Sequence, residues 1–166
     1  RVDDPLFVRA FVFDDGKESL ALAVVDSCML PRPLCDEVKK RVQRSTGIAH
    51  ERMLIAATHT HSAPGVMDFC LGSRQDPRYA RFLPAKIAEA MIEAFRSREP
   101  VEIAATRVDA GEFTKNRRWI TRPDKMGADP FGERSVRAMM HPGYSNPDYI
   151  GPSGPTDPWL TVMLIR

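Results

Sequence analysis

The fold is decided by residues 53–65, which read Met53-Leu54-Ile55-Ala56-Ala57-Thr58-His59-Thr60-His61-Ser62-Ala63-Pro64-Gly65. The apolar run at the start predicts a buried strand, and the Pro-Gly pair predicts a chain break after it. Open α/β sheets bind ligands at the carboxyl edge of their strands. Residues two apart in an extended chain point to the same side, which places His59 and His61 together at that edge. Two neutral imidazoles on one side are typical ligands of zinc.

Two histidines at this spacing can also be exposed loop residues or hydrogen-bonded histidines of a core. Two features of this chain favour a metal. It has only four histidines, and two of them lie here. The residues that follow, Ser62, Ala63 and Gly65, are small and leave room for a ligand. We therefore expect a metal centre at this strand end.

The composition is that of an ordinary globular protein. The 166 residues suffice for one domain with a real core, with 43% hydrophobic residues, 28% charged residues and a net charge of +2. These values exclude a disordered or collagen-like chain and give no support to nucleic-acid binding. The sequence has no apolar run of the roughly 18 residues that a membrane-spanning helix needs, and no signal peptide is visible in it. Because both ends adjoin strand patterns, we expect an amino-terminal piece of a longer protein, or a chain cut at both ends.

Periodicity predicts an α/β fold, with a mixed β-sheet and flanking helices. Leu34, Val38 and Val42 form a narrow buried stripe on the first helix. The strand that follows this helix should run parallel to its predecessor, by the rule for crossover connections. The expected elements are, in order, strands at 7–13 and 20–25 joined as a hairpin, a helix from 31–33 to Gly47, a strand at 53–57, a short and then a main helix after Asp76-Pro77 separated at Pro84, and strands at 101–108 and 160–166.

Residues 121–158 differ in character from the rest. They hold seven of the fourteen prolines and five of the ten glycines, and they show no sustained period. A connection of this length inside a compact domain is usually functional or disordered. We expect a long Pro/Gly-rich loop that covers or borders the site, the alternative being a surface insertion without a role.

The three cysteines, Cys28, Cys35 and Cys70, do not form a disulfide framework, because their number is odd and their spacing irregular. Cys28 and Cys35 could pair only if the turn between them brought them together. Buried or half-buried thiols are the simpler interpretation. The chain has no Cys-x-x-Cys motif, so a cysteine zinc knuckle is not expected.

The longer string around the histidines is more specific than the pair alone. Residues 54–65 resemble the zinc-site segment of the neutral/alkaline non-lysosomal ceramidases, which reads roughly A-T/S-H-T-H-S-G-P-G; they depart from it only at Ala63, where that family usually has Gly. After Asn116-Arg117 this chain has Arg-Trp, where the better-known ceramidases have Ser-Pro. The resemblance also includes the strand end Val24-Val25-Asp26-Ser27, the helix end Thr46-Gly47-Ile48, the Asn116-Arg117 pair and the closing segment 157–166.

The resemblance implies roles for three residues. His59 corresponds to the first zinc ligand, and His61 to a second histidine that lies beside the metal and contacts the substrate. Arg117 corresponds to an arginine that reaches the active site, where a guanidinium stabilises the charge that develops on an attacked carbonyl. The alternative for Arg117 is a solvated basic cluster with Lys115 and Arg118.

Asp26 ends the strand beside the histidine segment, at the same edge of the predicted sheet. A metal-bound histidine normally donates its other N–H to a carboxylate or a carbonyl. Asp26 is therefore our candidate for that contact with His59. The alternative is a strand-end aspartate that makes a turn or capping hydrogen bond.

These observations lead us to expect a zinc-dependent amide hydrolase that cleaves the N-acyl bond of ceramide-like lipids. The resemblance places the other zinc ligands and the nucleophile beyond Arg166, so this piece alone should bind zinc weakly and be inactive. It also implies a secreted, periplasmic or membrane-associated protein with peripheral membrane contact. The alternatives are a binding module whose metal site is degenerate, and a related metal hydrolase that acts on a soluble amide or ester.

Overall fold

The computed structural model describes residues 4–68, 73–143 and 145–166. The chain is mixed α/β and divides into two compact units, Arg1–Pro100 and Val101–Arg166. None of the helices within the described ranges is long and apolar enough to span a membrane.

The first unit contains a mixed three-stranded sheet, as the sequence predicts. Its strands are β1 (Val8–Asp14), β2 (Ser19–Val25) and β3 (Met53–Ala57). The order is β1-β2-β3, with β1 antiparallel to β2 and β2 parallel to β3. The predicted hairpin and the predicted parallel crossover are both confirmed. The short 3-10 helix at His50–Arg52 leads directly into β3.

Helix α1 (Arg32–Thr46) supplies the crossover between β2 and β3. It begins after Pro31, whose backbone is still extended. Its buried face is the predicted stripe of Leu34, Val38 and Val42. It ends at Gly47, which has a φ of 79° and donates its N–H to the Gln43 carbonyl. Glycine is favoured there because a left-handed backbone costs it no clash.

Helix α2 (Pro77–Arg96) is continuous through Pro84, so the predicted division into two helices is wrong. The proline removes one backbone hydrogen bond and crowds the preceding turn. Pro84 nevertheless lies on the buried face, together with Leu83, Ile87 and Met91. Burial of that face outweighs the local cost, because tertiary packing supplies most of a helix's stability. At the start of α2, the Asp76 carboxylate caps the free N–H groups of the first turn.

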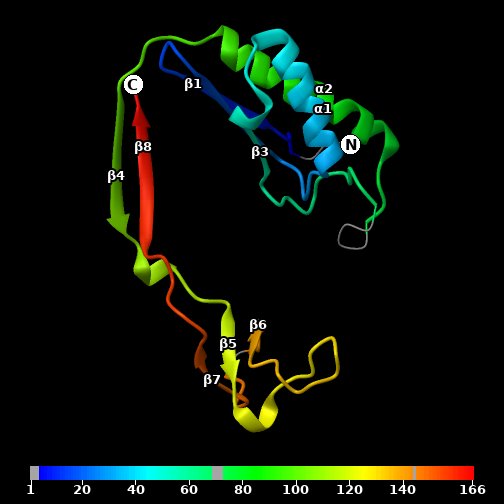
Figure 1. Cartoon of the computed structure of the whole chain (residues 1–166), viewed down its shortest axis with the longest axis vertical. Helices are drawn as coiled ribbons and strands as arrows, with labels where there is room; N and C mark the ends of the chain where they lie inside the picture. Colours follow the sequence, from blue (N-terminus) through cyan, green and yellow to red (C-terminus); the bar gives the residue numbers. More distant parts are fainter. Residues whose placement is uncertain (1–3, 69–72, 144) are drawn as a thin grey trace. The chain divides into compact units, whose positions relative to one another are not determined.

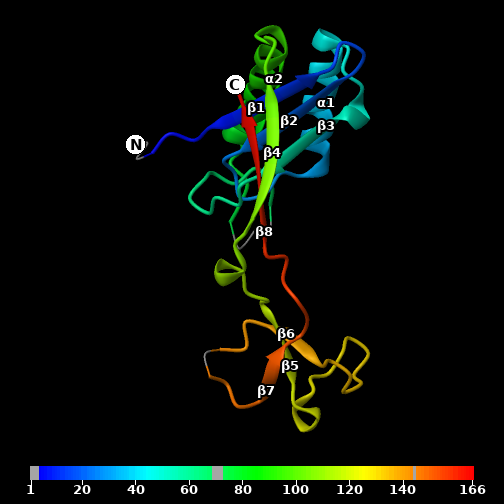
Figure 2. The same ribbon diagram turned by 90° about the vertical axis from the view of Figure 1, so that its left-hand side faces the viewer.

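Both helices cover the same face of the sheet, and Figures 1 and 2 show them side by side above it. Ala21, Ala23 and Val25 of β2 point into the core beneath them. The intervening positions of the strands face the other way. This second face exposes large apolar side chains: Phe11 (46% exposed), Leu20 (55%) and Leu54 (62%). The core of the first unit therefore lies on the helix side of the sheet.

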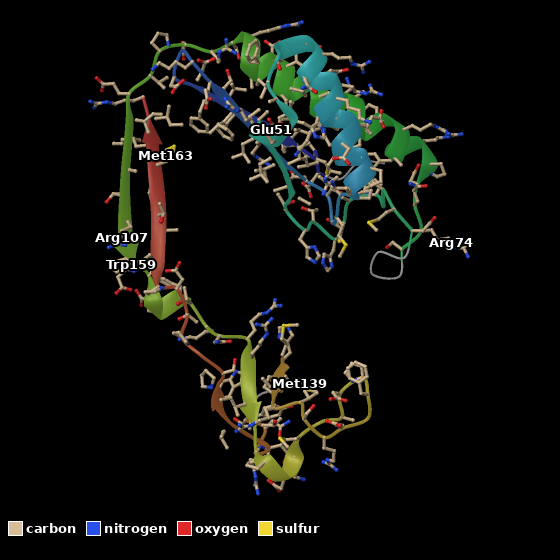
Figure 3. All side chains as sticks on the ribbon, viewed as in Figure 1. Glu51, Arg74, Arg107, Met139, Trp159 and Met163 are labelled. Carbon is tan, nitrogen blue, oxygen red and sulfur yellow. The ribbon has the colours of Figure 1, made fainter. Side chains whose placement is uncertain are left out.

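The second unit holds two small antiparallel sheets. Its elements are β4 (Ile103–Asp109), β5 (Arg118–Thr121), β6 (Ala138–Met140), β7 (Tyr149–Pro152) and β8 (Trp159–Ile165), with 3-10 helices at Gly111–Phe113 and Pro123–Lys125. Strand β4 pairs with β8, and β5 lies between β6 and β7. Figure 3 shows Arg107 of β4 beside Trp159 of β8, where the guanidinium carbon lies 4.5 Å from the ring centroid.

The segment 121–158 is consequently not a structureless loop throughout. It contributes β6 and β7, which pair on both sides of β5. These strands are three and four residues long. Strands this short leave too few alternating positions for a period to appear in the sequence.

Candidate metal centre

The candidate centre lies at the carboxyl ends of β2 and β3. The parallel pairing of these strands continues past their ends. The Thr58 N–H donates to the Val25 carbonyl over 3.0 Å, and the Thr60 N–H donates to the Ser27 carbonyl over 3.1 Å. The segment after β2 is thereby held alongside the segment that carries the two histidines.

His59 and His61 lie together, as the sequence predicts. Their ring centroids are 4.7 Å apart, and the ring planes meet at 78°. Simple strand alternation does not produce this arrangement, because His59 has a φ of 64° and is left-handed. The chain therefore turns at His59 and still brings both rings to one place. Both imidazoles are exposed and accessible to a ligand.

The Nδ1 atom of His59 lies 2.9 Å from the carbonyl oxygen of Cys28. A proton on Nδ1 can be donated to this carbonyl, which leaves the lone pair of Nε2 for a metal ion. Metal-bound histidines in proteins usually have such a partner for the other ring nitrogen, and it fixes the orientation of the ring. The Cys28 carbonyl thus makes the contact with His59 that we considered for Asp26.

Cys28 also brings its sulfur to the histidines. Its Sγ lies 3.9 Å from His59 Nδ1, and the ligand atoms of Cys28, His59 and His61 all lie within 4.8 Å of one another. Sulfur and imidazole nitrogen are the donors that zinc and other borderline or soft metal ions prefer. These three residues form a group that could hold a metal ion.

Asp26 lies at the end of β2 but turns toward β1. Its Oδ2 accepts the Phe7 N–H over 3.0 Å, and the Arg9 guanidinium lies 3.4 Å away. The hydrogen bond from the Phe7 backbone, followed by the charge of Arg9, lowers the pKa of this carboxyl group. This hydrogen bond links two strand ends, and it is neither a contact to His59 nor the turn or capping bond that we gave as the alternative for Asp26. It pins the start of β1 to the edge on which the centre lies.

Arg117 belongs to the second unit, whereas Cys28, His59 and His61 belong to the first. It is exposed, and its Nη2 lies 3.5 Å from Met140 Sδ. Its neighbour Asn116 is held in a turn, accepting the Arg118 N–H and donating to the Gly154 carbonyl. A role for Arg117 at the centre stays a prediction.

A close backbone contact leaves no room for a side chain at Gly65. A Cβ atom at this position would lie 2.7 Å from the carbonyl oxygen of Arg74, well inside contact distance. The Gly65 carbonyl also accepts the Asp76 N–H over 2.8 Å. Arg74 lies on the segment that leads into α2 (Figure 3). The glycine therefore joins the end of the histidine segment to the start of that helix.

Sequence reasoning missed Cys28 as a member of the site. Cys28 and Cys35 do not pair with each other, and Cys70 lies outside the described residues. One signal could have identified Cys28. It follows Asp26 by two positions, just beyond the strand whose parallel neighbour ends in the histidine pair.

No protein-family model matches the chain.

Proposed function

We propose that this chain is the amino-terminal part of a zinc-dependent amide hydrolase that resembles neutral ceramidase. The observation that carries the proposal is the grouping of Cys28, His59 and His61 at the carboxyl edge of β2 and β3. Both histidines of this group lie within the sequence string on which the resemblance is based. The proposed reaction is cleavage of the N-acyl bond of a ceramide-like lipid to a sphingoid base and a fatty acid.

In this proposal each residue has a separate task. His59 holds the ion through Nε2, while its Nδ1 remains against the Cys28 carbonyl. Zinc, when bound, polarises the amide carbonyl or activates the attacking group. His61 donates a hydrogen bond to the substrate or carries a proton, for which its exposed imidazole is suited. Arg117 adds positive charge near the attacked carbonyl.

The substrate class and the location of the protein follow from the same resemblance. A lipid substrate requires peripheral contact with a membrane, and we propose a secreted, periplasmic or membrane-associated protein. Fold and motif do not fix the substrate, because specificity depends on the pocket around the scissile bond.

A second candidate is a metal-binding module without catalysis, and one observation favours it. Cysteine and histidine side chains, which lie together here, are the donors of many structural zinc sites, in which four protein ligands fill the coordination sphere. A ligand set that leaves one position open for water or substrate would serve a hydrolase.

The test is elemental analysis of the full-length protein, wild type beside His59→Ala and His61→Ala, followed by a panel of substrates. We expect about one zinc per chain, which His59→Ala removes together with activity. His61→Ala should retain zinc better than His59→Ala and should lose rate. Activity on short soluble amides with none on ceramide would overturn the lipid assignment. Zinc without hydrolysis of any substrate would favour the binding module, and activity that survives both substitutions would overturn the site.

A further inference from the structure

We propose that the sulfur of Cys28 is a direct ligand of the ion that His59 holds, so that this sheet edge supplies one sulfur and one nitrogen ligand while His61 lies beside the ion. The proposal shares its ion with the proposed function but does not depend on the substrate or on catalysis. It changes the expected strength of the site, because the two segments that meet here supply two ligands, whereas the resemblance indicated one.

The backbone fixes the position of Cys28. Two hydrogen bonds extend the β2–β3 pairing beyond the strands, from Thr58 to Val25 and from Thr60 to Ser27. The next residue after Ser27 is Cys28, which is therefore carried to the histidine segment by the register of the sheet. A third contact, from His59 Nδ1 to the Cys28 carbonyl, closes the arrangement.

The spacing of the donor atoms fits a single ion. Tetrahedral zinc, with bonds of about 2.3 Å to sulfur and 2.0 Å to nitrogen, separates its ligand atoms by about 3.3–3.6 Å. In this structure the ligand atoms of Cys28 and His59 lie within 4.8 Å of each other. Shortening this separation by about 1 Å would give the spacing of a tetrahedral ion. Such an ion would keep two further positions for water, for substrate or for other protein ligands.

The donor set also defines the class of metal. A sulfur and an imidazole favour zinc, cobalt(II) and other borderline or soft ions over magnesium and calcium, which require oxygen donors. Access matters as well. Cys28 is half-buried and both histidines are exposed, so an ion and a thiol reagent can both reach the group.

The test is a cobalt(II) titration of the metal-depleted full-length protein, monitored by absorption. Cobalt bound to sulfur gives a charge-transfer band in the near ultraviolet, which cobalt bound only to nitrogen and oxygen lacks. We expect this band in the wild type and in the control variant Cys35→Ser, since Cys35 lies on α1 outside the group. Cys28→Ser should lose the band and should weaken cobalt binding by more than about tenfold.

Each contrary result overturns the proposal. A band that persists in Cys28→Ser means that another thiol binds the ion. Cobalt binding without the band in the wild type means that Cys28 is not a ligand, although zinc-dependent hydrolysis through His59 could still be found. Conversely, a band that depends on Cys28 in a protein that hydrolyses nothing supports the ligand and overturns the proposed function.

A second measurement needs no variant. Iodoacetamide forms a carbon–sulfur bond with a thiol and releases iodide, and peptide mass spectrometry reports the reaction at each cysteine. We expect zinc to slow alkylation of Cys28 and to leave the rate at Cys35 unchanged. Burial raises the pKa of the Cys35 thiol, which makes it a slow internal reference. Equal alkylation of Cys28 with and without zinc would overturn the proposal.

Discussion

The left-handed backbone of His59 gives a prediction that needs no metal and no substrate. His59 has a φ of 64°, and among the described non-glycine residues only His141 and Ser145 share a positive φ. For a residue with a Cβ atom this conformation costs about 1–2 kcal/mol, because Cβ approaches the following carbonyl oxygen. The candidate centre therefore holds backbone strain at its first expected ligand.

The perturbation is the pair of variants His59→Ala and His59→Gly. Both lose the imidazole and with it the contact to the Cys28 carbonyl, so they differ only in the Cβ atom. Glycine relieves the strain of about 1–2 kcal/mol but has more freedom to lose on folding, which costs about 0.5–1 kcal/mol. We expect the glycine variant to be the more stable one, by about 1 kcal/mol in the free energy of unfolding.

The assay is urea unfolding of both variants in the presence of a metal chelator, followed by circular dichroism. The matched control is Thr60→Ala beside Thr60→Gly, because Thr60 is the next residue and has no positive φ. At this control position the order should reverse, with glycine less stable than alanine by about 0.5–1 kcal/mol. If His59→Ala equals or exceeds His59→Gly in stability, the chain does not turn left-handed at this residue and the geometry of the centre is wrong.

Two further predictions concern the elements that support the centre. Asp76→Ala should lower the melting temperature by about 2–4 °C, because the carboxylate accepts the N–H groups of Arg78 and Tyr79 at the start of α2. The hydrogen bonds from Tyr79 and then Arg78 lower the pKa of Asp76, so this contribution is present above the unfolded pKa and is lost as the pH falls through the folded pKa. Thermal melts from neutral to strongly acidic pH should show this loss for wild type and not for Asp76→Ala; parallel curves would contradict the cap. Ile87→Ala should cost about 2–5 kcal/mol in urea unfolding, because Ile87 is 0% exposed at the centre of the core, whereas Glu93→Ala on the exposed face should change stability by less than about 0.5 kcal/mol. Equal effects at these two positions would refute the assignment of the buried face.

The parts of the fold that the sequence predicts are those that local signals determine. The stripe of Leu34, Val38 and Val42 and the glycine at position 47 suffice to define α1. An apolar run defines β2, and the crossover rule makes β3 parallel to it. The proximity of His59 and His61 also follows, since they are separated by only one residue.

The failures arise where distant parts of the chain decide the outcome. Pro84 is a helix breaker by local rules, and only its burial against the core explains a continuous α2. Strands β6 and β7 are too short to be seen as a pattern and form by pairing with β5. Asp26 takes its partner from Phe7, nineteen residues earlier in the chain. No local pattern indicates that contact.

Cys28 shows why the candidate centre could be predicted only in part. Its nearness to His59 depends on the register in which β2 and β3 pair, and the sequence does not state that register. A shift by one residue would reverse the faces of the shifted strand's side chains, moving Ala21, Ala23 and Val25 out of the core. Burial of these three side chains therefore fixes the register, and the register keeps Cys28 beside the histidines.

The centre therefore continues the pairing of β2 and β3, and this pairing fixes the positions of its residues. Ser27 is only 1% exposed, and its hydroxyl donates to the Met29 carbonyl, which anchors the segment on both sides of Cys28. Opposite it, the Thr58 and Thr60 N–H groups fix the histidine segment to the same strand end. Groups held on packed elements keep their geometry better than groups on loops, so the donor atoms are positioned before any ion arrives. The strain at His59 fits this view, because a left-handed residue persists only where its surroundings over-determine it.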